Sequence, residues 1–89
     1  MIKKVGKFHV YIVRCGDRTL YTGYTNDLDN RLKMHNSGKG AKYVRGRTPV
    51  KLVYTRAYKT LSHALKAEIA VKRLTRKEKL RLIKSGVPS

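Results

Sequence analysis

Glu68 is the residue of this sequence that most lacks an ordinary structural role. The chain has only five carboxylates, and the other four suit a turn or the first turn of a helix: Asp17, Asp27, Asp29 and Glu78. In a helix Glu68 lies among the apolar positions Leu61, Ala64 and Leu65, where a carboxylate costs free energy unless it is paired or binds a metal. A hard cation such as Mg²⁺ takes one or two carboxylates and keeps several waters. An ion pair with Lys72, four residues later, is the structural alternative, and the spacing does not decide between the two.

Arg31 and His35 form a second candidate pair because the i, i+4 spacing places them on one face of a predicted helix. Leu28 and Leu32 flank that face towards the core. An arginine at the core edge can present its planar fork to a phosphate, and a histidine can exchange a proton near neutral pH. The alternative is a solvated basic face with a half-buried histidine, and this pair alone favours that alternative.

Tyr11 and Tyr21 lie on two adjacent segments that are predicted to pair as a hairpin. We expect them within one or two rungs of each other. Strand tyrosines usually serve in cross-strand packing. Gly23 at the end of the second strand lets a ligand or another backbone approach closely, so a site near the two rings is also possible.

The charge of the chain indicates a polyanionic partner. Lys and Arg number 22 against 5 Asp and Glu, which gives a formal net charge of +17. Such self-repulsion disfavours a compact fold, whereas contact with phosphates rewards clustered cations. We therefore expect nucleic acid as partner. A membrane surface is not expected, because the aromatic residues lie in strand-like segments and not on a basic amphipathic helix. The lone Cys15 excludes a disulfide framework, and residues 1–7 lack an apolar signal core, so we expect a cytoplasmic protein.

The pattern along the chain predicts one α+β domain over residues 1–89, with its core at about 8–84, in the order β-β-α-β-α-α. The predicted strands are Phe8 to Cys15, Leu20 to Tyr24 and Val50 to Tyr58. The first predicted helix is capped by Thr25 or Asn26 and ends at 36–38. The second runs from Thr60 or Ser62 to about Leu74. The third begins with a Thr75–Glu78 capping box and ends near Ser85. Residues 39–49 form a loop rich in Lys, Arg and Gly.

Taken in order, these residues resemble the GIY-YIG nuclease superfamily. The first motif corresponds to Val10-Tyr11-Ile12, which keeps the tyrosine, and the second to Tyr21-Thr22-Gly23, which keeps the tyrosine and the glycine. Arg31, His35 and a helical Glu68 then follow in the order of that family. The resemblance is closest to the small stand-alone bacterial UPF0213 proteins. It covers residues 8–84 and is carried by the runs LYTGYTNDLDNRLKMHNSGKGAKYVRGRTPVKLVY and AEIAVKRLTRKEKLRLI.

The resemblance implies a small three-stranded antiparallel sheet flanked by helices, and hydrolysis of phosphodiester bonds, of DNA more than of RNA, with one divalent metal. Glu68 would hold Mg²⁺ or Mn²⁺, which would polarise the scissile phosphate. Tyr21 or Tyr11 would help to activate water, its phenol pKa lowered by the metal and by surrounding cations. Arg31 would neutralise charge that develops on the phosphate. His35 would relay a proton or orient a tyrosine, and the general base stays open between the two tyrosines and the histidine.

The basic loop would track the nucleic-acid backbone, with Tyr43 stacking on a base. The residues expected to bind nucleic acid are Lys39, Lys42, Tyr43, Arg45, Arg47 and Lys72. A disordered solvated loop is the structural alternative. For the whole protein, which we expect to be a monomer, the alternatives to a nuclease are a binding module of the same fold that acts with a protein partner, and a ribosomal-type RNA-binding protein without a site. The last leaves Glu68 unexplained.

Overall fold

The computed structural model describes residues 7–85 and contains three strands and three helices in the predicted order. The strands are β1 (Phe8–Arg14), β2 (Leu20–Thr25) and β3 (Lys51–Tyr58), and the helices are α1 (Leu28–Asn36), α2 (Leu61–Lys72) and α3 (Arg76–Ser85). The predicted α+β class is confirmed, and the ends of elements shift by one or two residues. Within the described part, no helix is long and apolar enough to cross a membrane.

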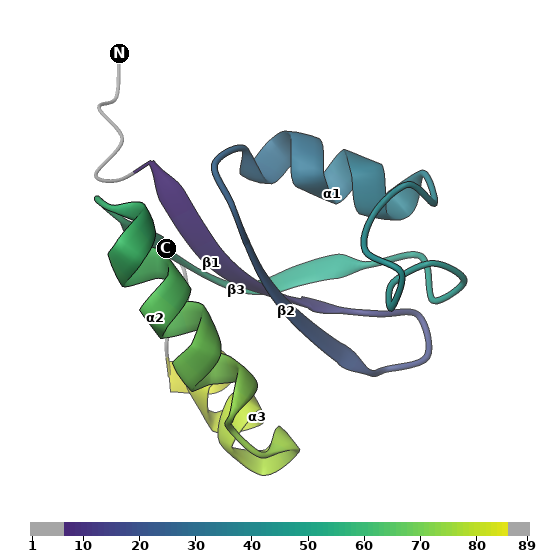
Figure 1. The fold of residues 1–89 in the computed structure, drawn as a ribbon. Helices are drawn as coiled ribbons and strands as arrows, with labels where there is room; N and C mark the ends of the chain where they lie inside the picture. The colour runs from purple at the N-terminus through teal and green to yellow at the C-terminus, as the bar shows by residue number, and fades with distance from the viewer. Residues whose placement is uncertain (1–6, 86–89) are drawn as a thin grey trace.

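The sheet is antiparallel with the strand order β2-β1-β3, so β1 is central and β2 is an edge strand. Successive side chains of a strand point to opposite faces, and both faces of β1 are buried. Val10 and Ile12 pack with α2 and α3, whereas Tyr11 and Val13 pack with α1 and the loop that follows it. Figure 1 shows α1 and α2 on opposite sides of the sheet. The fold is therefore three-layered, and a group from α1 and a group from α2 can meet only around a sheet edge.

The helix caps agree with the sequence at two helices and differ at one. Thr60 caps α2 by accepting the His63 N–H, and Thr75 and Glu78 form the reciprocal capping box of α3. The prediction of Thr25 or Asn26 as the cap of α1 is wrong. Asp27 is the cap, because its carboxylate accepts the N–H of the residue three positions later, while the Thr25 hydroxyl accepts the Asp27 N–H.

Two buried apolar residues, Val44 and Val50, anchor the loop between α1 and β3 in the core. Val44 is fully buried in the cluster on the α1 face, beside Val13 and Val50. The N–H groups of Val44 and Arg45 both donate to the Ala41 carbonyl, which gives the loop a helical turn. The alternative of a disordered solvated loop is therefore wrong: its basic side chains surround a buried anchor.

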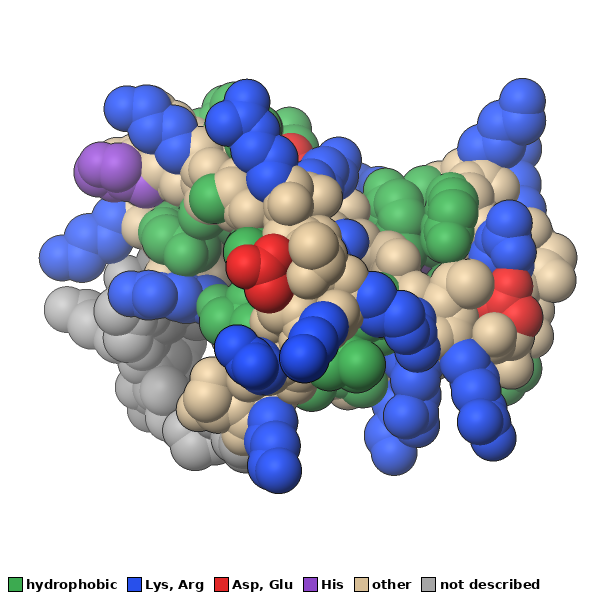
Figure 2. All heavy atoms as spheres, turned by 90° about the horizontal axis from the view of Figure 1, so that it is seen from below, with side chains coloured by type: hydrophobic (Ala, Val, Ile, Leu, Met, Phe, Trp, Pro, Cys, Tyr) green, Lys and Arg blue, Asp and Glu red, His purple; other side chains and the backbone are tan. Residues whose placement is uncertain are grey.

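Positive charge covers much of the surface. Figure 2 shows Lys and Arg side chains projecting from most of the face seen from below, with few acidic groups between them. Within residues 7–85 only two ion pairs join side chains, Arg47 with Asp17 and Lys72 with Glu68. Most cations therefore have no carboxylate partner, which disfavours the compact state unless an external anion neutralises them.

Candidate active site

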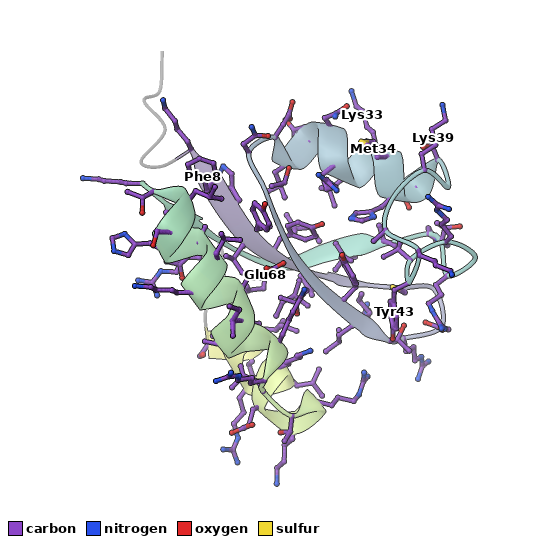
Figure 3. The ribbon with its side chains drawn as sticks, in the orientation of Figure 1. Phe8, Lys33, Met34, Lys39, Tyr43 and Glu68 are labelled. Carbon is purple, nitrogen blue, oxygen red and sulfur yellow. The ribbon has the colours of Figure 1, made fainter. Side chains whose placement is uncertain are left out.

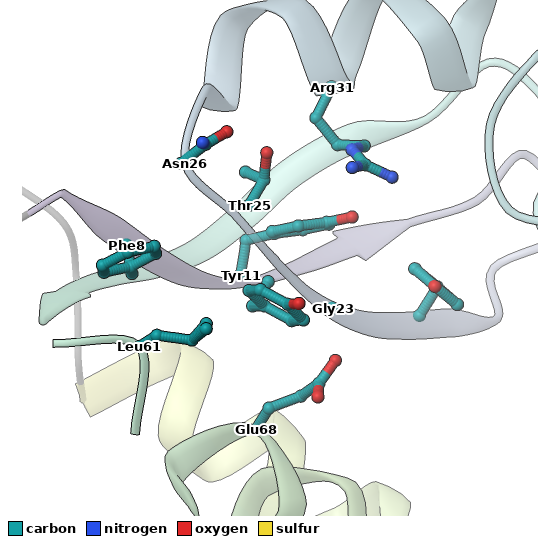
Figure 4. A pocket seen from close by; sticks show the side chains of 10 residues that line it. Phe8, Tyr11, Gly23, Thr25, Asn26, Arg31, Leu61 and Glu68 are labelled. Carbon is teal, nitrogen blue, oxygen red and sulfur yellow. The ribbon is translucent and has the colours of Figure 1, made fainter. Parts of the chain in front are cut away.

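A cavity of about 550 Å³ opens at the edge strand β2, between α1 and α2. It is lined from all three layers, and four of the five residues predicted to be catalytic line it: Tyr11, Tyr21, Arg31 and Glu68. In Figure 4 the Arg31 side chain reaches the cavity from α1 and Glu68 reaches it from α2, with Tyr11 and Gly23 between them. The fifth predicted residue, His35, lies behind Tyr11. The fold thus gathers around one opening residues that are far apart in sequence.

Gly23 makes room for the ring of Tyr11. The two residues are direct cross-strand partners in the β1–β2 ladder. A Cβ atom at Gly23 would lie 2.7 Å from the Tyr11 hydroxyl oxygen and 2.9 Å from Cζ of the same ring. Tyr21 pairs with Val13, two positions along β1, and its ring centroid is 6.4 Å from that of Tyr11. The predicted proximity of the two tyrosines is confirmed, and the role of the glycine is to let the Tyr11 phenol lie across β2 towards the cavity.

His35 contacts the Tyr11 hydroxyl group from α1. Its Nε2 atom is 2.9 Å from the hydroxyl oxygen, and its side chain is fully buried, not half-buried as the sequence suggested. The ring also packs edge-on against Tyr21, with centroids 5.6 Å apart. Gly40 packs against the imidazole ring, because a Cβ atom there would overlap Nδ1 of His35. His35 therefore does not line the cavity; it positions a tyrosine that does.

The protein environment keeps both members of this pair neutral. Burial raises the pKa of the Tyr11 phenol, Tyr21 adds to this effect, and the positive charge of Arg31 opposes it without overcoming it. Burial also lowers the pKa of the His35 imidazole from its ordinary value, and Arg31 lowers it further. Arg31 thus lowers the Tyr11 phenol pKa, as expected of a nearby cation, but desolvation of the buried anion outweighs this effect, so the net shift is upward.

The depressed pKa of His35 predicts a loss of stability in mild acid. In the unfolded chain His35 takes up a proton near pH 6.5, whereas the folded protein resists it. Below pH 6.5 the unfolded state therefore binds more protons, and the free energy of unfolding falls as the pH falls, by at most about 1.4 kcal/mol per pH unit. Urea unfolding at pH 7.5 and 5.5 measures this drop.

The matched variants for this prediction are His35→Gln and His63→Gln. The drop should disappear in His35→Gln, which cannot titrate, and should persist in His63→Gln, whose side chain is exposed. The carboxylates with lowered pKa, Asp17 and Glu78, lose their contributions only at more acidic pH. An undiminished drop in His35→Gln would contradict the assignment.

Glu68 forms the ion pair with Lys72 that its spacing allowed, and it also lines the cavity. Its carboxylate is 3.3 Å from the Lys72 ammonium group, and it also lines the cavity, with 14% of its side chain exposed. Figure 3 shows it directed from α2 towards the sheet. Lys72 is about half exposed, so its pairing with Glu68 contributes only a few tenths of a kcal/mol and can be exchanged for another cation. On the opposite wall, the Arg31 guanidinium has no carboxylate partner within residues 7–85.

The donor set of the cavity fits a hard divalent cation. One carboxylate and three tyrosine side chains line it, and its volume exceeds that of a hydrated ion. In the described part of the chain no three His, Cys, Asp or Glu side chains converge on one point, which is the pattern that a structural zinc site requires. Mg²⁺ differs, since it is commonly bound by one or two carboxylates, waters and substrate phosphates. Glu68 is the residue that would anchor such an ion.

The basic loop places Tyr43 and Arg47 next to the site, but both have partners within the protein. The Tyr43 ring stacks on Tyr21, with centroids 5.9 Å apart, and the Arg47 guanidinium carbon lies 4.5 Å from the centre of the Tyr43 ring. Arg47 also pairs with Asp17 at 2.6 Å. This chain of contacts ties the loop to the hairpin. The predicted stacking of Tyr43 on a base remains a prediction, and it requires an approach to the exposed part of this ring.

The remaining loop cations are on the surface. Lys39, Lys42 and Arg45 are exposed, and the Arg45 Nε donates to the Gly40 carbonyl. In Figure 3 Lys39 and Lys33 project outwards, away from the sheet. None of these three loop cations lines the cavity. Their predicted contacts would therefore be with parts of the nucleic acid other than the phosphate that reacts.

Several residues that shape the site are absent from the sequence-based prediction, and two of them have a clear structural role. Gly40 packs on the His35 ring, and Leu61, 41% exposed on the first turn of α2, lines the cavity. A glycine pair in a basic loop, at 38 and 40, reads only as a turn signal. Nothing in the pattern indicates that the second glycine contacts a histidine five residues earlier.

Comparison with known proteins agrees with this geometry. Residues 7–81 match the family model of the GIY-YIG catalytic domain. A UPF0213 protein of Staphylococcus aureus is 56% identical over 75 residues, which is 84% of this chain and 92% of the relative, and one of Oceanobacillus iheyensis is 53% identical over 75 residues, 84% of this chain and 87% of the relative. The solution NMR structure of the UPF0213 protein BH0048 from Bacillus halodurans superposes with a TM-score of 0.60 at 49% identity, covering 91% of this chain and 87% of that one. The chain therefore belongs to the GIY-YIG family and, within it, to the UPF0213 proteins.

Proposed function

We propose that this protein is an endonuclease that hydrolyses phosphodiester bonds of nucleic acid, DNA in preference to RNA, with one Mg²⁺ or Mn²⁺ ion. The observation that carries the proposal is the single cavity lined by Arg31, Tyr11 and Glu68 at the edge of the sheet, in a chain of net charge +17. When bound at Glu68, the ion would supply Lewis-acid polarisation of the phosphate and neutralise charge on the leaving oxygen.

Arg31 orients the scissile phosphate in this proposal. Its guanidinium enters the cavity from α1 without a carboxylate partner among the described residues, so its donors are free to bind two phosphate oxygens. As water attacks phosphorus, negative charge grows on those oxygens, and a fixed guanidinium stabilises the transition state more than the ground state. The bond from phosphorus to the leaving oxygen breaks, and that oxygen takes a proton from solvent.

Tyr11 and His35 move the proton of the attacking water. Because burial raises the phenol pKa, a free phenolate is disfavoured. The hydroxyl oxygen can instead accept the proton of the water while its own proton passes to Nε2 of His35, 2.9 Å away. The relay leaves the phenol neutral and passes through a protonated His35, which burial and Arg31 make short-lived, so its proton returns through Tyr11 to solvent after the phosphorus–oxygen bond breaks. It requires the His35 tautomer in which Nδ1 carries the hydrogen, so that Nε2 is free to accept.

A second candidate function is a nucleic-acid-binding module of the same fold with little or no catalysis, acting with a protein partner. The Lys72–Glu68 ion pair favours it, because a carboxylate satisfied by a lysine needs no metal. The two candidates share the charge and the fold, and they differ in whether Glu68 exchanges Lys72 for a divalent cation.

Cleavage by the purified protein tests the proposal. Labelled single-stranded, duplex and branched DNA, and matching RNA, are incubated with Mg²⁺, Mn²⁺ or EDTA. We expect shortened products with either ion and none with EDTA, since the leaving oxygen then lacks charge neutralisation. Binding of the same substrates without cleavage under every condition would contradict the nuclease proposal and support the binding module.

A further inference from the structure

A second cavity, of about 540 Å³, lies at the opposite end of the sheet from the site described above. It is formed where β1 ends, β3 begins and α3 starts, together with the turn between β1 and β2. Four cationic side chains line it, and none of its lining residues is acidic. The cations are Arg14, Arg18, Lys51 and Arg76. The two cavities share no residue.

The positions of these cations are unfavourable in the protein alone. Arg14 and Lys51 are direct partners in the β1–β3 ladder, so they face the same side of the sheet. Like charges directly opposite each other in a ladder destabilise a sheet. Within residues 7–85 neither side chain has a carboxylate partner. The repulsion between them is therefore uncompensated by the protein itself.

Asp17 is the carboxylate nearest to this cavity in sequence, and it is already engaged. Its Oδ1 accepts hydrogen bonds from the Thr19 backbone N–H and hydroxyl group, and its Oδ2 pairs with Arg47 at 2.6 Å. Arg47 does not line the second cavity. The Asp17 carboxylate therefore pairs with the basic loop and does not neutralise the cavity. The neighbouring Arg18 lines the cavity together with the other three cations.

The wall of the second cavity is fixed by the close contact of two loops. The Gly16 N–H donates to the Arg47 carbonyl at 2.6 Å, and a Cβ atom at Gly16 would lie 2.8 Å from the Thr48 carbonyl oxygen. The hairpin turn therefore packs directly on the segment that leads into β3. Leu80 of α3, 46% exposed, adds an apolar patch beside the cations. Cations beside an apolar side chain suit an anionic group that belongs to a larger, partly apolar ligand.

We infer that the second cavity binds a backbone phosphate of nucleic acid, and so forms a contact separate from the site of cleavage. The inference rests on the proposed function in naming nucleic acid as the ligand. Phe8 at the start of β1 lines the first cavity and Arg14 at its end lines the second. Six steps along a strand span roughly 20 Å, which is about six base pairs of a duplex at 3.4 Å each. A bound duplex therefore meets the protein at both ends of the sheet.

The salt dependence of binding tests this contact. Equilibrium binding of a duplex of about 20 base pairs is measured from low to moderate salt in the Glu68→Gln background, so that cleavage plays no part. Because the cavity is inferred to bind one phosphate, the double variant Arg14→Gln/Lys51→Gln should reduce the slope of log K against log salt by about 0.9, the contribution of one phosphate contact. The matched control, Lys33→Gln/Lys66→Gln, removes the same charge from exposed positions that line neither cavity and should change the slope much less.

Equal changes of slope in the two double variants would overturn the inference. Urea unfolding gives a second readout: the midpoint of Arg14→Gln/Lys51→Gln should rise, since a repulsive pair is removed, and a fall would also count against the argument. Titration with inorganic phosphate, followed by the amide signals of Gly16 and Arg18, separates a free anion from a nucleic acid. Saturation by phosphate together with an unaltered duplex slope would assign the cavity to a small anion and refute the inference. A difference in slope without cleavage by the wild type would refute only the nuclease proposal.

Discussion

Replacement of Glu68 by glutamine is expected to reduce cleavage by about 10²-fold or more, because an amide cannot supply the negative charge that holds a divalent cation. The fold should be retained. Glu68 lines the cavity and pairs only with a half-exposed lysine, so the free energy of unfolding should change by a few tenths of a kcal/mol. Binding of nucleic acid should be slightly tighter, since a negative charge is removed from the site. Initial rates of cleavage and a binding titration measure the two effects separately.

Glu78→Gln is the matched control, because it makes the same chemical change at an exposed carboxylate on the next helix. Glu78 accepts the Thr75 N–H in the α3 cap, and the amide oxygen of a glutamine can still accept this hydrogen bond, so the helix end should be retained. Its cleavage rate should equal that of the wild type. If Glu68→Gln and Glu78→Gln are equally active, Glu68 is not the metal ligand, and the activity comes from another site or a contaminant.

Gly23→Ala is expected to give the second large effect on activity. The backbone of Gly23 accepts an alanine without left-handed strain, but the added Cβ would lie 2.7 Å from the Tyr11 hydroxyl oxygen. The phenol must move, and its hydrogen bond to His35 is lost or lengthened. A displacement of about 1 Å in a reacting group can reduce the rate by about 10²-fold, and overpacking costs about 1–3 kcal/mol of stability.

A double-mutant cycle with Tyr11→Phe distinguishes this mechanism from general damage to the sheet. Tyr11→Phe removes the hydroxyl group and therefore the proton path through it. If Gly23→Ala acts by moving that hydroxyl, it should reduce cleavage far less in the Tyr11→Phe background than in the wild type. Additive losses in the double variant would show that the glycine acts elsewhere. Cleavage rates and urea midpoints of the four proteins complete the cycle.

The sequence predicted the elements because the local patterns are strong. The strand pattern of β1 and the Thr75–Glu78 capping box each lie within a few residues, and the strand and the cap are both confirmed. The cap of α1 was misplaced because Thr25, Asn26 and Asp27 are all competent caps. The choice depends on a turn in which the Thr25 hydroxyl accepts the Asp27 N–H, so that the helix begins after the aspartate.

The surroundings of the candidate site depend on contacts that no local pattern reveals. The buried His35 side chain forms a hydrogen bond with Tyr11, 24 residues away, and Arg47 forms an ion pair with Asp17, 30 residues away. The resemblance to the family placed Tyr11, Arg31 and Glu68 together, and their shared cavity agrees with it. The same resemblance did not indicate that Tyr43 stacks on Tyr21, or that Val44 anchors the loop. Both depend on packing between the loop and the hairpin.

Because the site draws side chains from all three layers, its integrity depends on the C-terminal helices. Glu68 comes from α2, and α3, which packs beside it, has no fully buried residue. Helices with few buried contacts open at lower free energy than the central strand of a sheet. Sub-global opening of α2 and α3 would remove the carboxylate while Tyr11, Arg31 and His35 stayed in place. Hydrogen exchange should therefore be faster in these helices than in β1. Heating should abolish cleavage before the sheet unfolds. The C-terminal helices would then set the upper temperature limit of activity.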